Sequence, residues 1–139
     1  MRIAEYTETN TTTWDNVPSC VVQMAGCNFR CCFCNNRRIV DVTEGYLSPS
    51  DVIESIKNNT FAEGVIITGG EPLVKRNIVS ICRRVAAVEG IREVCLTTNG
   101  LLLPQLAPEL KAAGVKRINL SLDTLDPDKY SYITRIGRL

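Results

Sequence analysis

The stretch "SCVVQMAGCNFRCCFC", Ser19 to Cys34, joins an apolar run to a cluster of four cysteines. From Ser19 to Ala25 the run is almost continuously apolar, where a half-exposed strand would alternate, and this predicts a buried strand. The cysteines follow where a loop would leave the carboxyl end of that strand. A buried strand followed by a chemically reactive loop is typical of an α/β protein, whose binding site lies at the ends of parallel strands.

Three further apolar runs resemble the first and predict strands at Gly64 to Thr68, Glu93 to Thr97 and Arg117 to Leu122. Amphipathic stretches alternate with these runs and predict helices. Two of them carry an N-cap followed by proline at the first helical position, Ser48 with Pro49 and Asp126 with Pro127. The other two helices are predicted at Val79 to Val88 and at Leu102 to Ala113, the latter ending at Gly114.

The repeated order of strand, loop and helix predicts an α/β fold of four parallel βα units over residues 19–139. Residues 1–18 precede the first unit and are expected to form an extended arm or hairpin. The length of 139 residues predicts a single domain.

The composition gives no strong overall charge, so binding partners are inferred from local sites. A net charge of +1 predicts no attraction to nucleic acid or to an acidic membrane surface. The chain has no apolar run of the roughly 20 residues that a membrane helix needs and no signal-peptide core, so we expect a cytoplasmic location. In a reducing compartment, clustered cysteines favour metal binding or redox chemistry over disulfides.

Each predicted strand ends in an unusual cluster of Cys, Gly or small polar residues: "AGCNFRCCFC", "TGGEP", "TTNG" and "SLDT". Because parallel strands end at one edge of the sheet, these clusters are expected to meet there. Paired glycines in "TGGEP" allow close backbone approach to a ligand, and Glu71 is placed to receive an ammonium group. A Gly-Gly turn with a solvated glutamate is the alternative.

Cys27, Cys31 and Cys34 have the spacing C-x3-C-x2-C, which suits three corners of an iron-sulfur cube and leaves the fourth iron open. A structural zinc site is disfavoured because the chain has no histidine and no second close cysteine pair. Cys32 is expected to be a small residue facing the core, because adjacent positions cannot easily reach the same cube. Buried, inert thiols are expected at Cys82 and Cys95.

The three cysteines with Phe33 before the last one, followed by "GGEP" at the next strand, resemble the radical S-adenosylmethionine superfamily. The resemblance implies an oxygen-sensitive [4Fe-4S] cluster on Cys27, Cys31 and Cys34. Its open iron would chelate S-adenosylmethionine, which is cleaved reductively to methionine and a hydrogen-abstracting 5'-deoxyadenosyl radical. The resemblance further implies cofactor-binding residues: Gly69, Gly70 and Glu71 at the methionine amino group, Phe33 near the adenine, Ser121 near the ribose or carboxylate, and Thr97 as the one match to a nucleotide pocket. Apolar Phe29 and Phe33 would shield the site from water.

Two subfamilies are visible within this resemblance. Residues 15–72 resemble the activating enzymes of glycyl-radical proteins, particularly of anaerobic ribonucleotide reductase, and residues 73–138 resemble the GTP cyclase of molybdenum-cofactor synthesis. The chain departs from the cyclase pattern at Cys20 and Ile66, where that pattern has arginines. We therefore expect that the chain by itself does not cyclise GTP.

The chain is short for the implied fold, since an eight-unit barrel needs roughly 250 residues. We expect a half or partial (βα) barrel, truncated relative to the six-unit barrel of the superfamily, with both edge strands of the parallel sheet unpaired. An engineered or chimeric half-barrel, a homodimer formed through the open sheet edges, and a natural short activase-like protein all stay open as explanations.

Partners follow from the implied chemistry. An external one-electron reductant is required, and the activase resemblance implies a protein substrate of the glycyl-radical type. Arg30, Arg37 and Arg38 would neutralise the cluster charge, meet the reductant or form a solvated face. The alternative function is a non-catalytic iron-sulfur cluster-binding or electron-transfer module, which would need neither the "GGEP" clamp nor an open iron.

Overall fold

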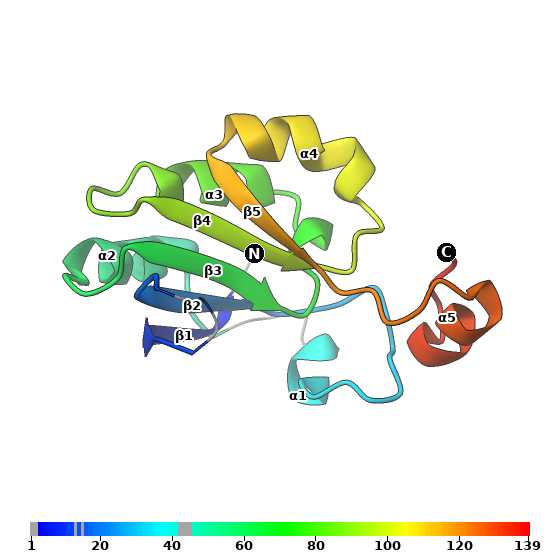
Figure 1. Cartoon of the computed structure of the whole chain (residues 1–139). Helices are drawn as coiled ribbons and strands as arrows, with labels where there is room; N and C mark the ends of the chain where they lie inside the picture. The colour runs from blue at the N-terminus through cyan, green and yellow to red at the C-terminus, as the bar shows by residue number, and fades with distance from the viewer. Residues whose placement is uncertain (1–2, 13, 15, 42–45) are drawn as a thin grey trace.

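The computed structural model describes residues 3–12, 14, 16–41 and 46–139, and shows an α/β fold with one five-stranded sheet (Figure 1). The strands are β1 (Ile3–Asn10), β2 (Ser19–Met24), β3 (Gly64–Gly69), β4 (Glu93–Thr98) and β5 (Val115–Leu120). They lie in sequence order across the sheet. Strands β2 to β5 are parallel, which confirms the predicted α/β class.

The N-terminal arm forms β1, which pairs antiparallel with β2. One expectation is corrected, because this pairing covers the β2 edge of the parallel sheet. The edges of the sheet are therefore β1 and β5.

The helices are α1 (Arg37–Val40), α2 (Pro49–Asn58), α3 (Ile78–Ala86), α4 (Leu103–Ala112) and α5 (Pro127–Thr134), with a 3-10 turn η1 (Pro72–Val74). Both predicted N-caps are present. Ser48 Oγ accepts the backbone N–H of Asp51 at 3.1 Å, and Asp126 Oδ1 accepts that of Asp128 at 3.0 Å. Beyond α4, Gly114 has a φ of 93°, a left-handed conformation that favours glycine.

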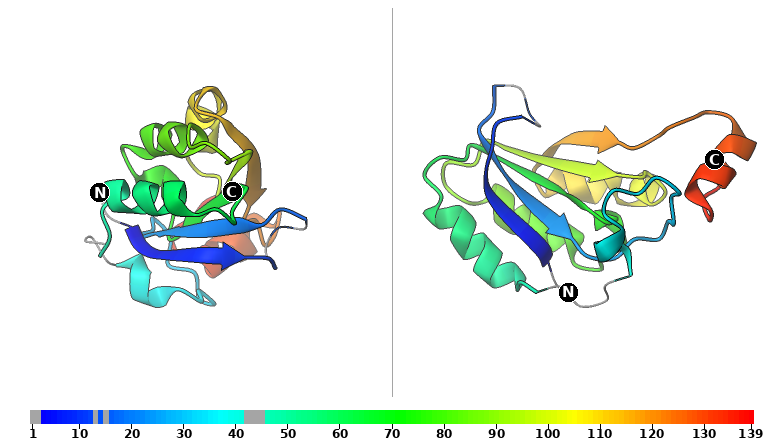
Figure 2. Two further views of the ribbon diagram at one scale, coloured as in Figure 1. Left: turned by 90° about the vertical axis from the view of Figure 1, so that its left-hand side faces the viewer. Right: turned by 90° about the horizontal axis from the view of Figure 1, so that it is seen from below.

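Helices α2, α3 and α4 cover one face of the sheet, as the views in Figures 1 and 2 agree. Most of the core lies there, and its largest fully buried side chains include Met24, Ile56, Ile67 and Leu96. The opposite face carries a smaller apolar cluster at its amino-terminal end, formed by Trp14, Val21, Ile66 and Cys95. The guanidinium of Arg117 lies 4.7 Å from the centre of the Trp14 ring.

Helix α5 lies beyond the carboxyl end of β5, away from the other helices (Figure 1). Its buried residues contact the cysteine loop rather than a face of the sheet. The Phe29 and Tyr130 rings meet edge to face with their centres 6.1 Å apart, and Tyr130 is 5% exposed. The end of the chain therefore supports the predicted site.

Among the described residues, none of the helices has both the length and the apolar character that crossing a membrane requires.

Candidate functional site

A cavity of about 250 Å³ lies at the carboxyl ends of the parallel strands, and we call it the inner cavity. It is lined by every site residue predicted from the sequence: Cys27, Cys31, Phe33, Cys34, Gly69, Gly70, Glu71, Thr97 and Ser121. These residues lie at the carboxyl ends of the four parallel strands or in the loops that follow them. The structure thus brings together the four sequence clusters at one edge of the sheet.

The paired glycines allow the β3 loop to pack against the β2 loop. A Cβ at Gly70 would lie 2.1 Å from Gly26 O, and one at Gly69 would lie 2.6 Å from Met24 N. Gly69 also has a φ of 107°. The contact is held by two backbone hydrogen bonds, from Gly70 N to Met24 O at 2.8 Å and from Glu71 N to Gly26 O at 2.9 Å.

The Glu71 carboxylate is buried, with 1% of the residue exposed, and it accepts three hydrogen bonds. Its Oε1 accepts from the backbone N–H of Leu73 at 2.9 Å and from Thr98 Oγ1 at 2.7 Å. Its Oε2 accepts the backbone N–H of Asn99 at 2.7 Å. The alternative of a solvated glutamate is therefore wrong, and the carboxylate ties the β3 loop to the β4 loop.

The β4 loop continues this connection to the cysteines. Asn99 Nδ2 donates to Asn28 Oδ1 at 2.8 Å, and Asn28 follows Cys27 directly. Asn99 also lines the inner cavity. Sequence reasoning named neither asparagine as a site residue, although they lie in the strand-end clusters "AGCNFRCCFC" and "TTNG".

The cysteine loop is anchored to α1 on one side and to α5 on the other. Gly26 N donates to Ile39 O at 2.7 Å and Cys27 N to Val40 O at 3.1 Å. Cys32 N donates to Ile133 O at 3.0 Å, and Arg30 N donates to Thr134 O at 3.1 Å. These four bonds fix the backbone from which the three predicted ligands project.

The three predicted ligand thiols influence one another. Burial raises the pKa of Cys27, and the neighbouring Glu71 and Cys34 raise it further, against the opposing effect of the Phe29 N–H. Burial also raises the pKa of Cys31, as do Cys27 and Cys34. The backbone N–H of Phe29 donates to Cys27 Sγ at 3.3 Å, a bond that would also stabilise a coordinated thiolate.

The described residues contain no group of three or more His, Cys, Asp or Glu side chains drawn together around a single metal ion. A cube differs from one ion because each cysteine binds a different iron atom. Three thiols that line one cavity are a donor set that fits such a cluster.

The two phenylalanines of the loop differ in environment. Both line the inner cavity, but Phe29 is buried whereas Phe33 is 53% exposed. The expectation that both rings shield the site therefore does not fit the exposed Phe33. Ser121 lies one residue beyond β5, because this strand begins and ends two residues earlier than predicted, and its N–H donates to Thr98 O at 2.8 Å.

Comparison with protein families gives a match to the family described as "Radical SAM superfamily", over residues 21–138. The chain belongs to the radical SAM superfamily. Similar curated proteins are GTP 3',8-cyclases, including that of Geobacter sulfurreducens (45% identity over 117 residues, 81% of this chain and 36% of the relative). The cyclase of Peptoclostridium acidaminophilum is 44% identical over 121 residues, with the same coverage.

The chain spans about a third of the length of these curated relatives. An alignment of 117 residues exceeds residues 73–138, so the cyclase similarity is not confined to that part of the chain. Among solved structures, QueE from Escherichia coli matches with a TM-score of 0.45 and 20% identity, over 71% of this chain and 51% of that one. The family and the cyclase relatives indicate an enzyme.

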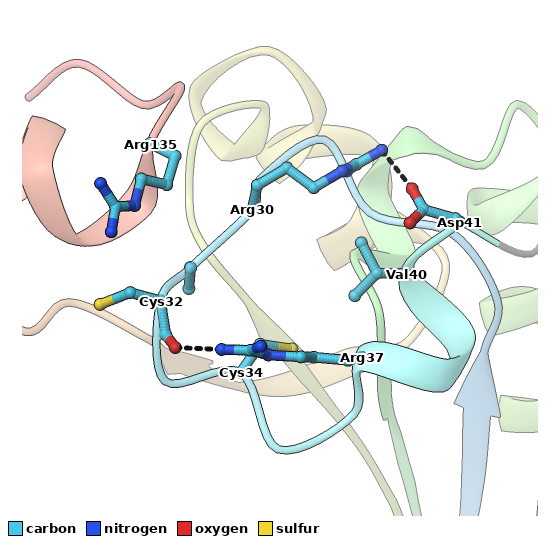
Figure 3. Close-up of a pocket in the computed structure, with 8 residues that line it drawn as sticks. Arg30, Cys32, Cys34, Arg37, Val40, Asp41 and Arg135 are labelled. Atoms are coloured by element: carbon cyan, nitrogen blue, oxygen red, sulfur yellow. Dashed lines mark hydrogen bonds and ion pairs between the residues drawn. The ribbon is translucent and has the colours of Figure 1, made fainter.

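A second cavity, of about 390 Å³, lies on the other side of the radical SAM cysteine loop, and we call it the outer pocket (Figure 3). Its lining includes Arg30, Cys31, Cys32, Cys34, Arg37 and Arg135. Cys32 is half-buried and lines this pocket, so the expectation that it faces the core is wrong. It lies outside the inner cavity, in contrast to the three predicted ligands.

Two arginines hold the loop from the outer side. Arg30 donates to the carbonyl oxygens of Cys27 and Phe29, each at 2.9 Å, and pairs with Asp41 at 2.6 Å. Arg37 donates to the carbonyl oxygen of Cys32, as Figure 3 shows. Arg38 instead pairs with Glu5 at 3.0 Å.

Proposed function

We propose that this chain carries a [4Fe-4S] cluster on Cys27, Cys31 and Cys34 and binds S-adenosylmethionine in the inner cavity. When bound, the reduced cluster supplies the electron that cleaves a carbon-sulfur bond of the cofactor, giving methionine and a 5'-deoxyadenosyl radical for hydrogen abstraction. The observation that carries the proposal is that all three cysteines and all six predicted cofactor residues line one cavity.

The chain's own residues position and enclose the reactants. The closely packed Gly69 and Gly70 present backbone groups, without side chains, to the methionine end of the cofactor. The carboxylate of Glu71 orders this turn by accepting three hydrogen bonds. It can therefore accept only about one more hydrogen bond, from the ammonium group of the cofactor. Thr97 and Ser121 provide hydroxyl groups at the cavity wall, and Phe33 offers a ring to the adenine.

The alternative of a non-catalytic cluster carrier makes a different prediction for the inner cavity. A carrier needs no ligand beside the cluster, whereas here the cavity extends from the cysteines to polar groups at the carboxyl ends of β4 and β5. This extension favours the enzyme.

Cysteine variants test the ligand set. After anaerobic reconstitution, Cys34→Ala should lose most cluster iron and sulfide, whereas Cys32→Ala should retain both. S-adenosylmethionine should change the electron paramagnetic resonance spectrum of the reduced wild-type cluster. Equal iron loss in both variants would overturn the ligand assignment, and a spectrum unmoved by the cofactor would favour the carrier.

Partners are part of this proposal. The chemistry requires an external one-electron reductant, and a glycyl-radical protein is the macromolecular substrate class that the activase resemblance suggests. The β5 edge and the exposed side chains beyond it, Leu122 and Leu125, suggest homodimer formation through open sheet edges and closure of a barrel between two partial barrels. Light scattering at micromolar concentration tests this point, and a strict monomer would exclude closure by pairing.

A further inference from the structure

We propose that the outer pocket is the docking surface of an acidic one-electron carrier protein, which reduces the cluster through the back of the cysteine loop. This inference rests on the proposed function, because it presupposes a cluster on the three cysteines. The reductant would bind at the outer pocket and would need an acidic surface.

The cysteine loop is a thin wall between two cavities. Cys31 and Cys34 line both the inner cavity and the outer pocket. A cofactor in the inner cavity would occupy the side facing the sheet. A donor seated in the outer pocket would therefore be separated from the cluster by little more than the loop itself.

The outer pocket is positively charged, although the whole chain is nearly neutral. Arg30, Arg37 and Arg135 line it, all three are exposed, and Asp41 is the acidic residue in its lining. Counted without a cluster, the arginine and aspartate side chains of the lining sum to +2, and because Arg30 pairs with Asp41, Arg37 and Arg135 carry that excess charge. A concave, charged surface steers partners of opposite charge and accelerates their association.

A purely structural role is the alternative for two of these arginines, because Arg30 and Arg37 donate to carbonyl oxygens of the loop. Arg135 distinguishes the two roles. Its guanidinium lies 4.9 Å from the centre of the Tyr132 ring, and it makes no hydrogen bond to the loop within the part of the chain that the structure describes. Figure 3 shows it across the pocket from Arg37, so its charge faces the pocket without holding the loop.

The proposed step transfers a single electron. The reduced carrier loses one electron, the oxidised cluster gains it, and no bond forms or breaks. The carrier then leaves in its oxidised form.

The experiment compares Arg135→Glu with wild type and with Arg84→Glu, an equal charge change at an exposed position of α3. Each reconstituted protein is mixed in a stopped-flow instrument with a reduced acidic [2Fe-2S] ferredoxin, and separately with reduced methyl viologen, a small cation. Titration calorimetry with oxidised ferredoxin, in the absence of S-adenosylmethionine, measures affinity independently of turnover.

We expect Arg135→Glu to slow reduction by ferredoxin on the order of fivefold at low ionic strength and to weaken its binding similarly. Near 1 M salt the difference should shrink to within twofold, because the Debye length falls to about 3 Å. Reduction by the viologen should not slow, and Arg84→Glu should match wild type throughout.

Equal ferredoxin rates and affinities for Arg135→Glu and Arg84→Glu would overturn the docking surface while leaving the proposed function intact. The same conclusion follows if the wild-type cluster is reduced by viologen but not by ferredoxin. Failure of the wild type to hold a reducible cluster would overturn the proposed function and the docking surface together.

Discussion

The buried carboxylate of Glu71 gives the sharpest test of how the inner cavity is built. Its two oxygens accept hydrogen bonds from Leu73 N, Thr98 Oγ1 and Asn99 N. In Glu71→Gln the side chain keeps one acceptor oxygen and gains an amide that can only donate. Whichever way the amide turns, at least one of the three donors then faces another donor.

The cost follows from those contacts. An unsatisfied buried donor costs about 1 to 3 kcal/mol, and the remaining bonds lose their charge assistance. We therefore expect the free energy of unfolding to fall by about 2 to 4 kcal/mol. Urea denaturation of the reduced, cluster-free chain, followed by circular dichroism under anaerobic conditions, measures this difference.

Glu63→Gln is the matched control, because the 44%-exposed side chain of Glu63 pairs with Arg92 at 3.0 Å on the surface. Loss of such a pair costs at most about 1 kcal/mol. If Glu71→Gln destabilised the chain no more than Glu63→Gln, the carboxylate would not connect the β3 and β4 loops as described.

Three further predictions concern the thiols and α5. In the folded, cluster-free chain, iodoacetamide should label the four loop cysteines and leave the buried Cys20, Cys82 and Cys95 unmodified. Peptide mass spectrometry measures this labelling, and rapid modification of the three buried thiols would refute their burial. Burial raises the pKa of Cys82 to about 12, so the unfolded chain loses this proton first as the pH rises above about 9. The free energy of unfolding should therefore fall between about pH 9 and pH 12, by up to about 1.4 kcal/mol per pH unit for this thiol. Cys82→Ala should flatten the plot of urea midpoint against pH over this range. An unchanged slope would contradict the raised pKa of Cys82. Tyr130→Ala removes the ring that packs on Phe29 and should weaken the packing of α5 on the cysteine loop by about 3 kcal/mol. Amide hydrogen exchange should then be faster in α5 than in α2. Equal protection of the two helices would mean that other contacts hold α5.

The regular part of the fold was predictable because its signals are local. Buried parallel strands are continuously apolar, and the N-caps Ser48 and Asp126 mark helix starts within a few residues. The edge strand β5 was placed two residues late, because the exposed Lys116 separates Val115 from the rest of the apolar run. The short α1 and η1 leave too few residues for a periodic pattern.

The position of the candidate residues at one edge of the sheet was predictable, since their clusters all end parallel strands of one sheet. Their contacts were not, because these join residues far apart in sequence. The bond from Asn99 to Asn28 spans 71 positions, and Cys32 meets Ile133 about one hundred positions away. No local pattern records that the last helix supports the cysteine loop and that Cys32 faces the outer pocket.

The yield of 5'-deoxyadenosine tests the central claim most directly. The chain is reconstituted anaerobically, reduced with dithionite, mixed with S-adenosylmethionine and analysed by liquid chromatography with mass detection. We predict 5'-deoxyadenosine and methionine from the wild type and from Cys32→Ala, and neither product from Cys31→Ala. An intact, reduced wild-type cluster that yields no 5'-deoxyadenosine would contradict the account and leave the chain as a cluster carrier.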